Sequence, residues 1–341
     1  MVTDRFLVTG ALGCIGAWTV RRLLTEGAVV VTYDLPGDPY RLRLVLDDEQ
    51  LGRVTAVNGD VTDLDAVERA VTDNRITHIV HLAGLQIPFV RADPVRGMHV
   101  NAVGTTVIFE AARRHRDLVR GLAYASSAAV WGPRPAYHPG RLTSADVPAP
   151  VTLYGVTKVA NEGTARVYWN EHQLASVGLR PYVVYGAGRD QGLTSFPSKA
   201  MLAAAVGRSY EIKLGGLVGM ELADDVAAMF IRAARATADG VVQEAVAGDV
   251  GGPSVGMPEV LAAIEAAAPE AAGRITLADD IGPNLPEVSG DVVAEAIGGF
   301  SFTPLAEGVS ATLELFRAAA ASGRIDVDRA LALPVPPVHA A

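Results

Sequence analysis

Short apolar runs alternate with helix-like segments through the first half of the chain. The strand-like runs are Phe6–Thr9, Val29–Tyr33, Val54–Val57, His78–Leu82, Leu122–Ala125 and Ala175–Val184. The helix-like segments between them include Asp63–Asp73, Val95–Arg114 and Val151–His172. Strands that alternate with helices in this way predict a parallel sheet with crossover helices on its faces.

The order of elements is less regular after Gly186. Later elements are predicted as helices over Asp225–Ala236, Met257–Ala267 and Leu305–Ala320 and as a strand over Val241–Ala247. We expect these segments to form a small lobe over the carboxyl edge of the sheet, where open α/β sheets bind ligands. The predicted division is a sheet domain over 1–186, a lobe over most of 187–330 with some segments returning to the sheet domain, and a flexible tail over 331–341. Leu333–Pro337, within that tail, should be extended.

Composition excludes several classes of protein. With 341 residues, of which 50% are hydrophobic, the chain can build a large core without disulfides. Its one cysteine, Cys14, rules out an intrachain disulfide and favours a reducing compartment. A net charge of −9 without a basic cluster argues against nucleic acid or an acidic membrane as a partner. The start of the chain lacks a signal-peptide pattern and no apolar run is long enough to span a membrane, so we expect a cytoplasmic protein.

A glycine-rich turn follows the first predicted strand. Gly10, Gly13 and Gly16 are spaced as GxxGxxG, and a helical pattern follows from Trp18. Glycines here allow a tight turn and a close approach of the backbone to a pyrophosphate at the helix N-terminus. Tight turns also use glycine without any ligand, so the prediction depends on the surrounding strand, helix and second strand. The pattern predicts an α/β fold of Rossmann type, with a doubly wound parallel sheet and a smaller C-terminal substrate-binding lobe.

An acidic residue, Asp34, ends the second predicted strand. A carboxylate at this place accepts hydrogen bonds from the ribose of an adenosine and repels a 2′-phosphate. Asp34 therefore favours NAD over NADP, although Arg41 and Arg43 are close enough in sequence to pair with a 2′-phosphate. The alternative for Asp34 is a turn residue before Pro36-Gly37.

Tyr154 and Lys158 are four residues apart in a predicted helix, and Ser127 lies twenty-seven residues before Tyr154. Positions i and i+4 share one face of a helix. A lysine ammonium beside the phenol favours the phenolate, which can take a proton from an alcohol. The same spacing is common on solvated helices, so the catalytic interpretation of this pair depends on the other motifs of the chain.

Taken together, these motifs resemble those of the extended short-chain dehydrogenases/reductases of the NAD-dependent epimerase/dehydratase family. The resemblance is strong to about Gly188 and loose afterwards. It rests on motifs in the family's order: the turn at residues 8–16, Asp60-Val61, the segment 81–84, Asn101, the segment 126–132, and the pair Tyr154 and Lys158.

The resemblance implies a catalytic triad and an NAD site. Tyr154 would take the hydroxyl proton, Lys158 would support it and hold the nicotinamide ribose, and Ser127 would orient the substrate oxygen. The residues that it assigns to NAD are Gly10, Gly13, Cys14, Ile15, Gly16, Asp34, Asp60, Val61, Leu82, Ala83, Gly84, Asn101, Tyr154, Lys158 and Pro181.

Several of these residues have another interpretation. Cys14 is expected to pack within the turn rather than to act as a nucleophile. Ser127 could bond backbone groups at the strand end, although that role suits Ser126 better. Asn101 is equally well explained as a helix-interior residue bonded to a neighbouring strand.

The sequence departs from the family's nucleotide-sugar enzymes at three places. Ser127-Ala128-Ala129 stands where the dehydratases resemble Thr-Asp-Glu, so the acid pair for water elimination is missing. Val183 and Val218 stand where an asparagine and an arginine usually help to bind the diphosphate. Arg189, Lys199 or Arg208 could substitute for them. The substrate contacts that we predict are Gln86, Ser127, Arg189, Thr194 and Ser195, with Arg189 as the partner of an anionic substrate.

These features predict an NAD-dependent oxidoreductase that oxidises a secondary alcohol or lactol of a small polar substrate, such as a sugar, sugar acid or hydroxy acid. The alternative is a sugar or nucleotide-sugar epimerase that oxidises its substrate only transiently. A third reading is a catalytically silent NAD-sensing protein, against which the triad argues. We expect no metal, because His78 and His81 would face opposite sides of a strand. The helices over Val95–Arg114 and Val151–His172 resemble those of the family's two-fold interface, so a homodimer is expected.

Overall fold

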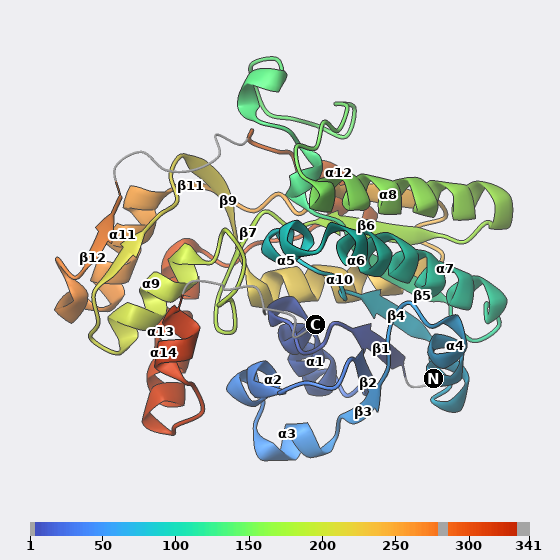
Figure 1. Ribbon diagram of the computed structural model, residues 1–341, viewed down its shortest axis with the longest axis horizontal. Helices are drawn as coiled ribbons and strands as arrows, with labels where there is room; N and C mark the ends of the chain where they lie inside the picture. Colours follow the sequence, from blue (N-terminus) through green and yellow to red (C-terminus); the bar gives the residue numbers. More distant parts are fainter. Residues whose placement is uncertain (1–3, 279–285, 333–341) are drawn as a thin grey trace.

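The computed structural model describes residues 4–278 and 286–332, and its central feature is a sheet of seven parallel strands (Figure 1). The strand order is β10-β6-β5-β4-β1-β2-β3. Their bounds are β1 Arg5–Thr9, β2 Val29–Asp34, β3 Thr55–Asn58, β4 His78–His81, β5 Gly121–Ala125, β6 Ser176–Arg180 and β10 Ala245–Asp249. The predicted doubly wound Rossmann-type sheet is therefore confirmed.

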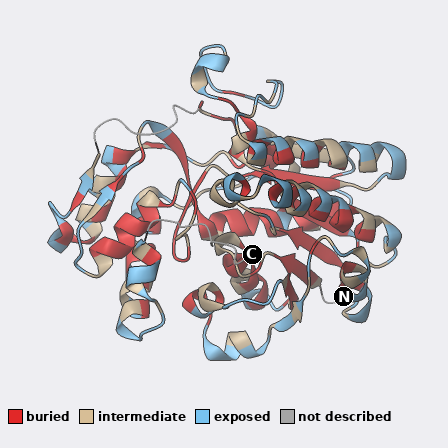
Figure 2. Ribbon diagram, viewed as in Figure 1, coloured by how far each residue is buried: buried red, intermediate tan, exposed pale blue. Residues whose placement is uncertain are grey.

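Helices cover both faces of this sheet because alternate residues of each strand point to opposite sides. Phe6 and Val8 pack with helices α1 (Cys14–Thr25) and α10 (Ala223–Ala238). Leu7 packs on the other side with α4 (Leu64–Asp73), α7 (Gly104–Arg114) and α8 (Leu153–His172). Strands β1, β2, β4, β5 and β6 and helix α10 are buried along most of their length, whereas the edge strand β3 is mostly exposed (Figure 2). Two short helices, α2 (Tyr40–Val45) and α3 (Asp48–Gly52), connect β2 to β3.

The order of strands places a switch point beside β1. From β1 the chain first moves outward to β2 and β3, and then crosses back to β4, β5 and β6 on the other side. The loops that leave β1 and β4 therefore diverge at the carboxyl edge of the sheet. Open α/β sheets bind their ligands in the crevice that such a divergence creates.

Segments after β6 build smaller sheets beside the main one (Figure 1). Strands β7 (Val183–Tyr185), β9 (Leu217–Leu222) and β11 (Ser254–Gly256) form one, and β8 (Tyr210–Ile212) pairs with β12 (Ile275–Leu277). The helices beside them are α9 (Phe196–Ala205), α11 (Met257–Ala267), α13 (Leu305–Ala321) and α14 (Val327–Leu331). Strand β10 and helix α10 instead belong to the main sheet, and α12 (Asp291–Ala296) packs on β10.

Some boundaries differ from those predicted. The strand predicted over Ala175–Val184 divides at Pro181, which has no N–H for the ladder, so the chain leaves β6 and begins β7 in another sheet. The helix predicted over Val95–Arg114 consists of α6 (Pro94–Met98), a π-helical turn (His99–Val103) and α7. Strand β3 begins one residue later than predicted, and β10 begins at Ala245 rather than Val241. The predicted extended segment Leu333–Pro337 lies outside the described residues.

Candidate active site

A cavity of about 400 Å³ lies at the carboxyl ends of the central strands. Its walls come from the segments that follow β1, β4, β5 and β6, from the start of α8 and from the loop over residues 188–194. The cavity thus lies at the switch point of the sheet, where the topology predicts a ligand.

The glycine turn forms one wall of this cavity. Gly10 has a φ of +71°, and a Cβ there would lie 2.6 Å from the backbone nitrogen of Ala83. A Cβ on Gly16 would lie 2.2 Å from the carbonyl oxygen of Gly10. The first turn of α1 has no side-chain cap, so its backbone N–H groups are directed to whatever binds there. This arrangement fits the pyrophosphate of a dinucleotide.

Cys14 begins helix α1 and lines the cavity. Its thiol donates a weak hydrogen bond to the carbonyl of Ala187, with the sulfur 3.7 Å from the oxygen. Burial raises the pKa of Cys14 to about 12, so the thiol stays protonated at neutral pH. The residue packs in the turn and does not act as a nucleophile.

Asp34 faces the glycine turn from the end of β2. Its Oδ2 accepts a hydrogen bond from the backbone nitrogen of Ala11 at 2.9 Å. Burial raises the pKa of Asp34 to about 7, and hydrogen bonds from the backbone N–H groups of residues 10–12 act in the opposite direction. The carboxyl group is partly buried beside the turn, where it can accept hydrogen bonds from ribose hydroxyls.

The two arginines near Asp34 are engaged elsewhere. Arg41 donates to Oδ1 of Asp190 at 2.6 Å and to the carbonyl of Leu12 at 3.0 Å. Arg43 pairs with Asp38 at the surface, at 2.5 Å. A 2′-phosphate would therefore have to displace an existing partner to gain either guanidinium.

The residues assigned to NAD by resemblance divide into those that line the cavity and those that do not. The residues that line it are Gly10, Cys14, Ile15, Gly16, Leu82, Gly84, Tyr154, Lys158 and Pro181. The residues that do not line it are Gly13, Asp34, Asp60, Val61, Ala83 and Asn101. Asp60 and Val61 come after β3 and Gly59, and the hydroxyl of Tyr33, beside Asp34, donates to the carbonyl of Asp60 at 3.1 Å. The second group thus includes residues at the ends of β2 and β3, to one side of the cavity.

Tyr154, Lys158 and Ser127 all line the cavity. Thr152 caps α8 by accepting from the backbone nitrogen of Gly155 at 3.0 Å, which places Tyr154 in the first turn. The Lys158 side chain is almost completely buried, and its Nζ donates to the carbonyl of Ala125 at 2.7 Å. This ammonium lies 5.4 Å from the centre of the Tyr154 ring.

Ser127 begins the short turn that follows β5. Its Oγ accepts from the backbone nitrogen of Ala129 at 3.1 Å, so it takes the backbone role considered for it from sequence. That bond uses an acceptor lone pair, and the hydroxyl proton has no acceptor among the described residues. Ser127 can therefore still donate to an oxygen bound in the cavity.

Ser126 belongs to a buried charged network that sequence analysis did not foresee. Its Oγ donates to Oε1 of Glu162 at 2.5 Å, so its partner is a carboxylate and not the backbone group expected. Arg180 donates to both oxygens of Glu162, at 2.7 and 2.8 Å, and to Oδ2 of Asp249 at 3.3 Å. Asp249 in turn accepts from Nε1 of Trp131 at 3.0 Å, which holds that indole in the cavity wall. Glu162 lies four residues after Lys158, and this helical spacing was the available signal.

Asn101 supports the loop that follows β4. It lies in the π-helical turn and is 1% exposed. Its Oδ1 accepts from the backbone nitrogen of Leu85 at 2.7 Å, and its Nδ2 donates to the carbonyl of Leu85 at 3.0 Å. A longer bond of 3.4 Å reaches Thr157 on α8. Asn101 thus positions the loop containing Gly84 and Gln86 against α8.

Three of the additional residues predicted to contact substrate line the cavity: Gln86, Arg189 and Thr194. Ser195 lies outside the cavity walls, because its side chain is buried and donates to the carbonyl of Gly192 at 2.9 Å. The wall residues that sequence analysis did not single out include Ile87, Pro88 and Arg91 of helix α5 (Ile87–Ala92), together with Gln191. Three of these residues lie in a short helix and one lies in a loop, and no spacing in the sequence assigns them to a ligand.

The two valines that replace diphosphate-binding residues are buried in the core. Val183 is 0% exposed and Val218 is 3% exposed, and neither lines the cavity. Of the three cations considered as substitutes, Lys199 donates to the carbonyl of Ala332 and Arg208 pairs with Asp328. Arg189 is the member of this set that lines the cavity.

Two further findings concern the described residues as a whole. They contain no group of three or more His, Cys, Asp or Glu side chains placed to hold a metal ion. No helix in the described ranges is both long enough and apolar enough to cross a lipid bilayer.

A Rossmann-type sheet, an uncapped helix behind a glycine turn and a tyrosine–lysine pair in one cavity define a dinucleotide-binding protein of the short-chain dehydrogenase/reductase class. Comparisons with known proteins agree. The model of the NAD dependent epimerase/dehydratase family matches residues 6–247. The chain belongs to this family, and NAD is its cofactor.

Individual relatives and solved structures support the assignment. A UDP-glucose 4-epimerase of Mycolicibacterium smegmatis is 35% identical over 239 residues, which cover 67% of this chain and 72% of that protein. The structure of UDP-glucose 4-epimerase from Thermus thermophilus with NAD has a TM-score of 0.75 at 25% identity and covers 92% of this chain and 99% of that one. An L-threonine dehydrogenase from Cupriavidus necator has a TM-score of 0.77 at 24% identity over 91% of this chain and 99% of that chain, which shows the shared fold.

The position of Asp34 generates a prediction about cofactor binding. Asp34→Asn should weaken NAD binding and reduce the preference for NAD over NADP. In the unaltered protein, NAD affinity should fall as the pH drops through the Asp34 pKa of about 7, because protonation removes the charged acceptor for the ribose hydroxyls. The fall should approach about tenfold per pH unit well below that pKa.

Calorimetric titration of both cofactors across that pH range measures this. Asp34→Asn should flatten the pH dependence, whereas the surface variant Asp38→Asn should retain it. Tighter binding of NADP than of NAD by the unaltered protein would contradict the assignment.

Proposed function

We propose that this protein is an NAD-dependent oxidoreductase that oxidises a secondary alcohol or lactol of a small polar substrate, such as a sugar, sugar acid or hydroxy acid. The observation that supports it most is that Ser127, Tyr154 and Lys158 line the same cavity as the glycine turn. A base, an orienting hydroxyl and a cofactor wall therefore share one water-accessible space, as an alcohol oxidation requires.

Each residue has a role that follows from its contacts. Tyr154 as phenolate takes the hydroxyl proton of the substrate. Lys158 is held by the carbonyl of Ala125 near the Tyr154 ring, where its positive charge stabilises the phenolate. Ser127 donates to the same substrate oxygen and orients it. NAD, when bound, supplies the acceptor for the hydride that leaves the carbon.

The choice of a small substrate is supported by Val183 and Val218. Both are buried in the core, so neither position offers the cavity a polar group for a diphosphate. Arginine and amide groups are the side chains that bind paired phosphates strongly.

The alternative proposal is an epimerase, and it is favoured by the relatives. The M. smegmatis protein at 35% identity is a UDP-glucose 4-epimerase. An epimerase would use the same base and the same cofactor but return the hydride before releasing the substrate. The two proposals therefore differ in whether NADH accumulates.

The first test concerns the base. Tyr154→Phe should abolish turnover by at least about a hundredfold, because general-base catalysis contributes factors of this order. NAD binding should remain largely intact, since the change removes one oxygen. The measurement is NADH formation with a panel of polar alcohols, beside calorimetric titration with NAD.

Lys158→Met should impair both NAD binding and turnover, because Lys158 serves the ribose and the phenolate. Tyr137→Phe is a matched control, because this hydroxyl accepts from the backbone nitrogen of Gly132 away from the triad. Near-normal turnover by Tyr154→Phe would show that another residue is the base.

A second test separates the two proposals. UDP-, GDP- and dTDP-sugars should not bind the NAD-loaded protein in calorimetric titration, and NADH should accumulate in stoichiometric excess over enzyme with the true substrate. Low-micromolar binding of a nucleotide sugar, with interconversion of its epimers and no accumulation of NADH, would replace the first proposal by the second.

We also propose that the protein forms a homodimer through α6, the π-helical turn and α8. Exposed valines lie along these packed helices: Val95 is 81% exposed, Val167 49%, Val103 43% and Val156 40%. Apolar side chains gathered on one face favour contact with a partner. A two-fold interface would bury this face in both copies.

The dimer proposal predicts a dimeric mass at micromolar concentration in analytical ultracentrifugation. Val156→Asp should shift the protein toward monomer, because a charge in the interface is costly. Val241→Asp, at a 70% exposed position after α10, should leave the mass unchanged. A monomeric mass for the unaltered protein would refute the proposal.

A further inference from the structure

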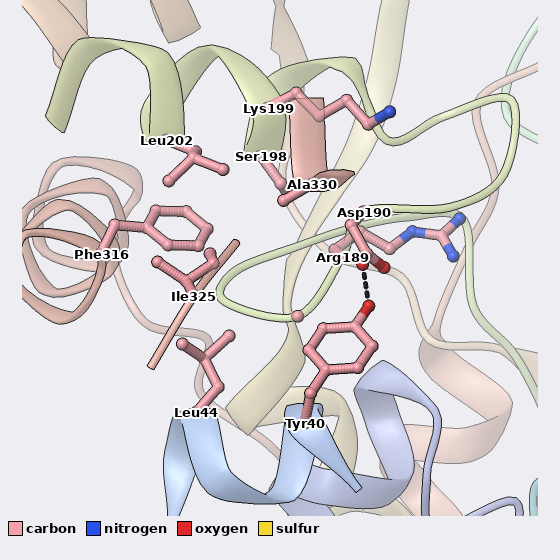
Figure 3. Close-up of a pocket in the computed structure, with 11 residues that line it drawn as sticks. Tyr40, Leu44, Arg189, Asp190, Ser198, Lys199, Leu202, Phe316, Ile325 and Ala330 are labelled. Atoms are coloured by element: carbon pink, nitrogen blue, oxygen red, sulfur yellow. Dashed lines mark hydrogen bonds between the residues drawn. The ribbon is translucent and has the colours of Figure 1, made fainter. Parts of the chain in front are cut away.

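Two neighbouring residues in the loop after β7 point in different directions. Asp190 turns toward α2, where it accepts from the Tyr40 hydroxyl (Figure 3). It also accepts from Arg41. The Arg189 guanidinium extends away from Tyr40 and Asp190 (Figure 3). It lines the large cavity. The loop makes this divergence with glycines at positive φ on both sides, Gly188 at +89° and Gly192 at +93°.

Arg189 is a partly buried charge without an acidic partner in the described part of the chain. Its Nη2 donates to Oγ1 of Thr194 at 3.0 Å, whereas its Nε is buried and has no acceptor among the described residues. No carboxylate among the described residues forms an ion pair with Arg189, whereas the nearby Arg41 forms one with Asp190. Burial lowers the pKa of Arg189, and the Cys14 and Tyr154 side chains act in the opposite direction. A desolvated guanidinium of this kind is strongly stabilised by an anion that it can bind in bidentate fashion.

Gln86, in the loop after β4, approaches the same place. Its Oε1 is buried and has no donor among the described residues. A Cβ added to Gly192 would lie 2.6 Å from this Oε1 and 3.1 Å from Nη2 of Arg189. The amide and the guanidinium therefore flank one point next to the Gly192 backbone. Among the described residues, Oε1 of Gln86 lacks a donor, and Nε of this guanidinium lacks an acceptor while its Nη2 is bonded to Thr194. A ligand that carries both an anionic oxygen and a hydroxyl would satisfy both side chains.

We propose that Arg189 and Gln86 form a seat for a substrate carboxylate and its neighbouring hydroxyl, so that the substrate is a hydroxy acid or a sugar acid rather than a neutral sugar. This inference rests on the proposed function, because it orients the acid toward the cavity that contains Tyr154. Arg189 receives the carboxylate through two parallel N–H donors, and Gln86 accepts from the adjacent hydroxyl.

The pyrophosphate of NAD is another source of anionic oxygens. We assign the seat to the substrate because Thr194 and Gln86, which accompany Arg189, both lie outside the glycine turn that receives the pyrophosphate. The test therefore follows NAD binding and acid binding separately.

The experiment compares matched acids and neutral analogues. Binding of D-glucuronate, D-galacturonate, D-gluconate and glycerate is titrated calorimetrically against D-glucose, D-galactose, D-glucitol and glycerol. The protein is NAD-loaded Tyr154→Phe, which retains the seat but lacks the base, so that binding is measured without turnover. At least one acid should bind at least about 30-fold more tightly than its neutral partner.

Variants then locate the preference. Arg189→Met should weaken binding of that acid by about 30-fold or more and leave its neutral partner and NAD within a factor of about two. Gln86→Leu should weaken the acid by a smaller factor. Arg91→Met is the matched control, because it removes the same charge from an exposed side chain of the cavity wall. It should change acid binding little.

Arg189→Met should also leave the thermal midpoint of the NAD-loaded, substrate-free protein unchanged or raise it, since it removes a partly buried charge that no acid among the described residues compensates. A lower midpoint together with unchanged acid preference would show a structural role and overturn the inference. Absence of any acid preference across the panel would overturn it too, as would equal losses in Arg189→Met and Arg91→Met. A loss of NAD affinity without a change in acid preference would assign the arginine to the pyrophosphate instead.

The proposed function is judged by a different measurement, the formation of NADH by the protein with Tyr154 intact. Arg189-dependent binding of an acid without NADH formation would uphold the carboxylate seat and refute the oxidoreductase proposal. NADH formation from a neutral alcohol that binds as tightly as its acid would support the oxidoreductase proposal and refute the carboxylate seat.

Discussion

The contact between Gly16 and the carbonyl of Gly10 determines where the site can form. A Cβ on Gly16 would lie 2.2 Å from that oxygen, so only glycine lets α1 start this close to the end of β1. The same closeness brings Trp18 of α1 to the loop after β7, where its Nε1 donates to the carbonyl of Ala187 at 3.0 Å. The glycine turn therefore positions the helix that receives the cofactor and also one anchor of the loop that carries Arg189.

The loop over residues 186–194 connects the cofactor half of the molecule to the segments that follow β7. Asp190 is its main attachment, because it binds both Tyr40 and Arg41 of α2. Arg41 extends the connection to the carbonyl of Leu12 within the glycine turn. Arg189 is adjacent to Asp190 and is thus held by the same attachment while it faces the opposite way (Figure 3). This arrangement keeps a partly buried cation in the cavity, and no acid among residues 4–278 and 286–332 forms an ion pair with it.

Behind the triad, a buried network of charges supports the strand ends that carry it. Ser126, Glu162, Arg180, Asp249 and Trp131 are joined by hydrogen bonds and lie next to the segment that contains Ser127. Because breaking a buried pair leaves an uncompensated charge, such a network gives the surrounding backbone little freedom. It connects α8, β6 and β10 to the turn after β5, so the positions of Tyr154 and Ser127 depend on strands from both halves of the chain.

The amino-acid sequence by itself determined the parallel sheet, the glycine turn and the pair Tyr154 and Lys158, because each of these signals lies in a short segment with a fixed spacing. The grouping of Ser127 with that pair came from the resemblance to the family. The sequence also indicated NAD through Asp34. Only the tertiary structure decided that Pro181 ends one strand and begins another sheet, and that Ser195 turns away from the cavity. The partner of Arg41 is 149 residues distant, and that of Asp249 is 69 residues distant. Pairings of this kind follow from the order of strands and the direction of each side chain, which no local pattern encodes.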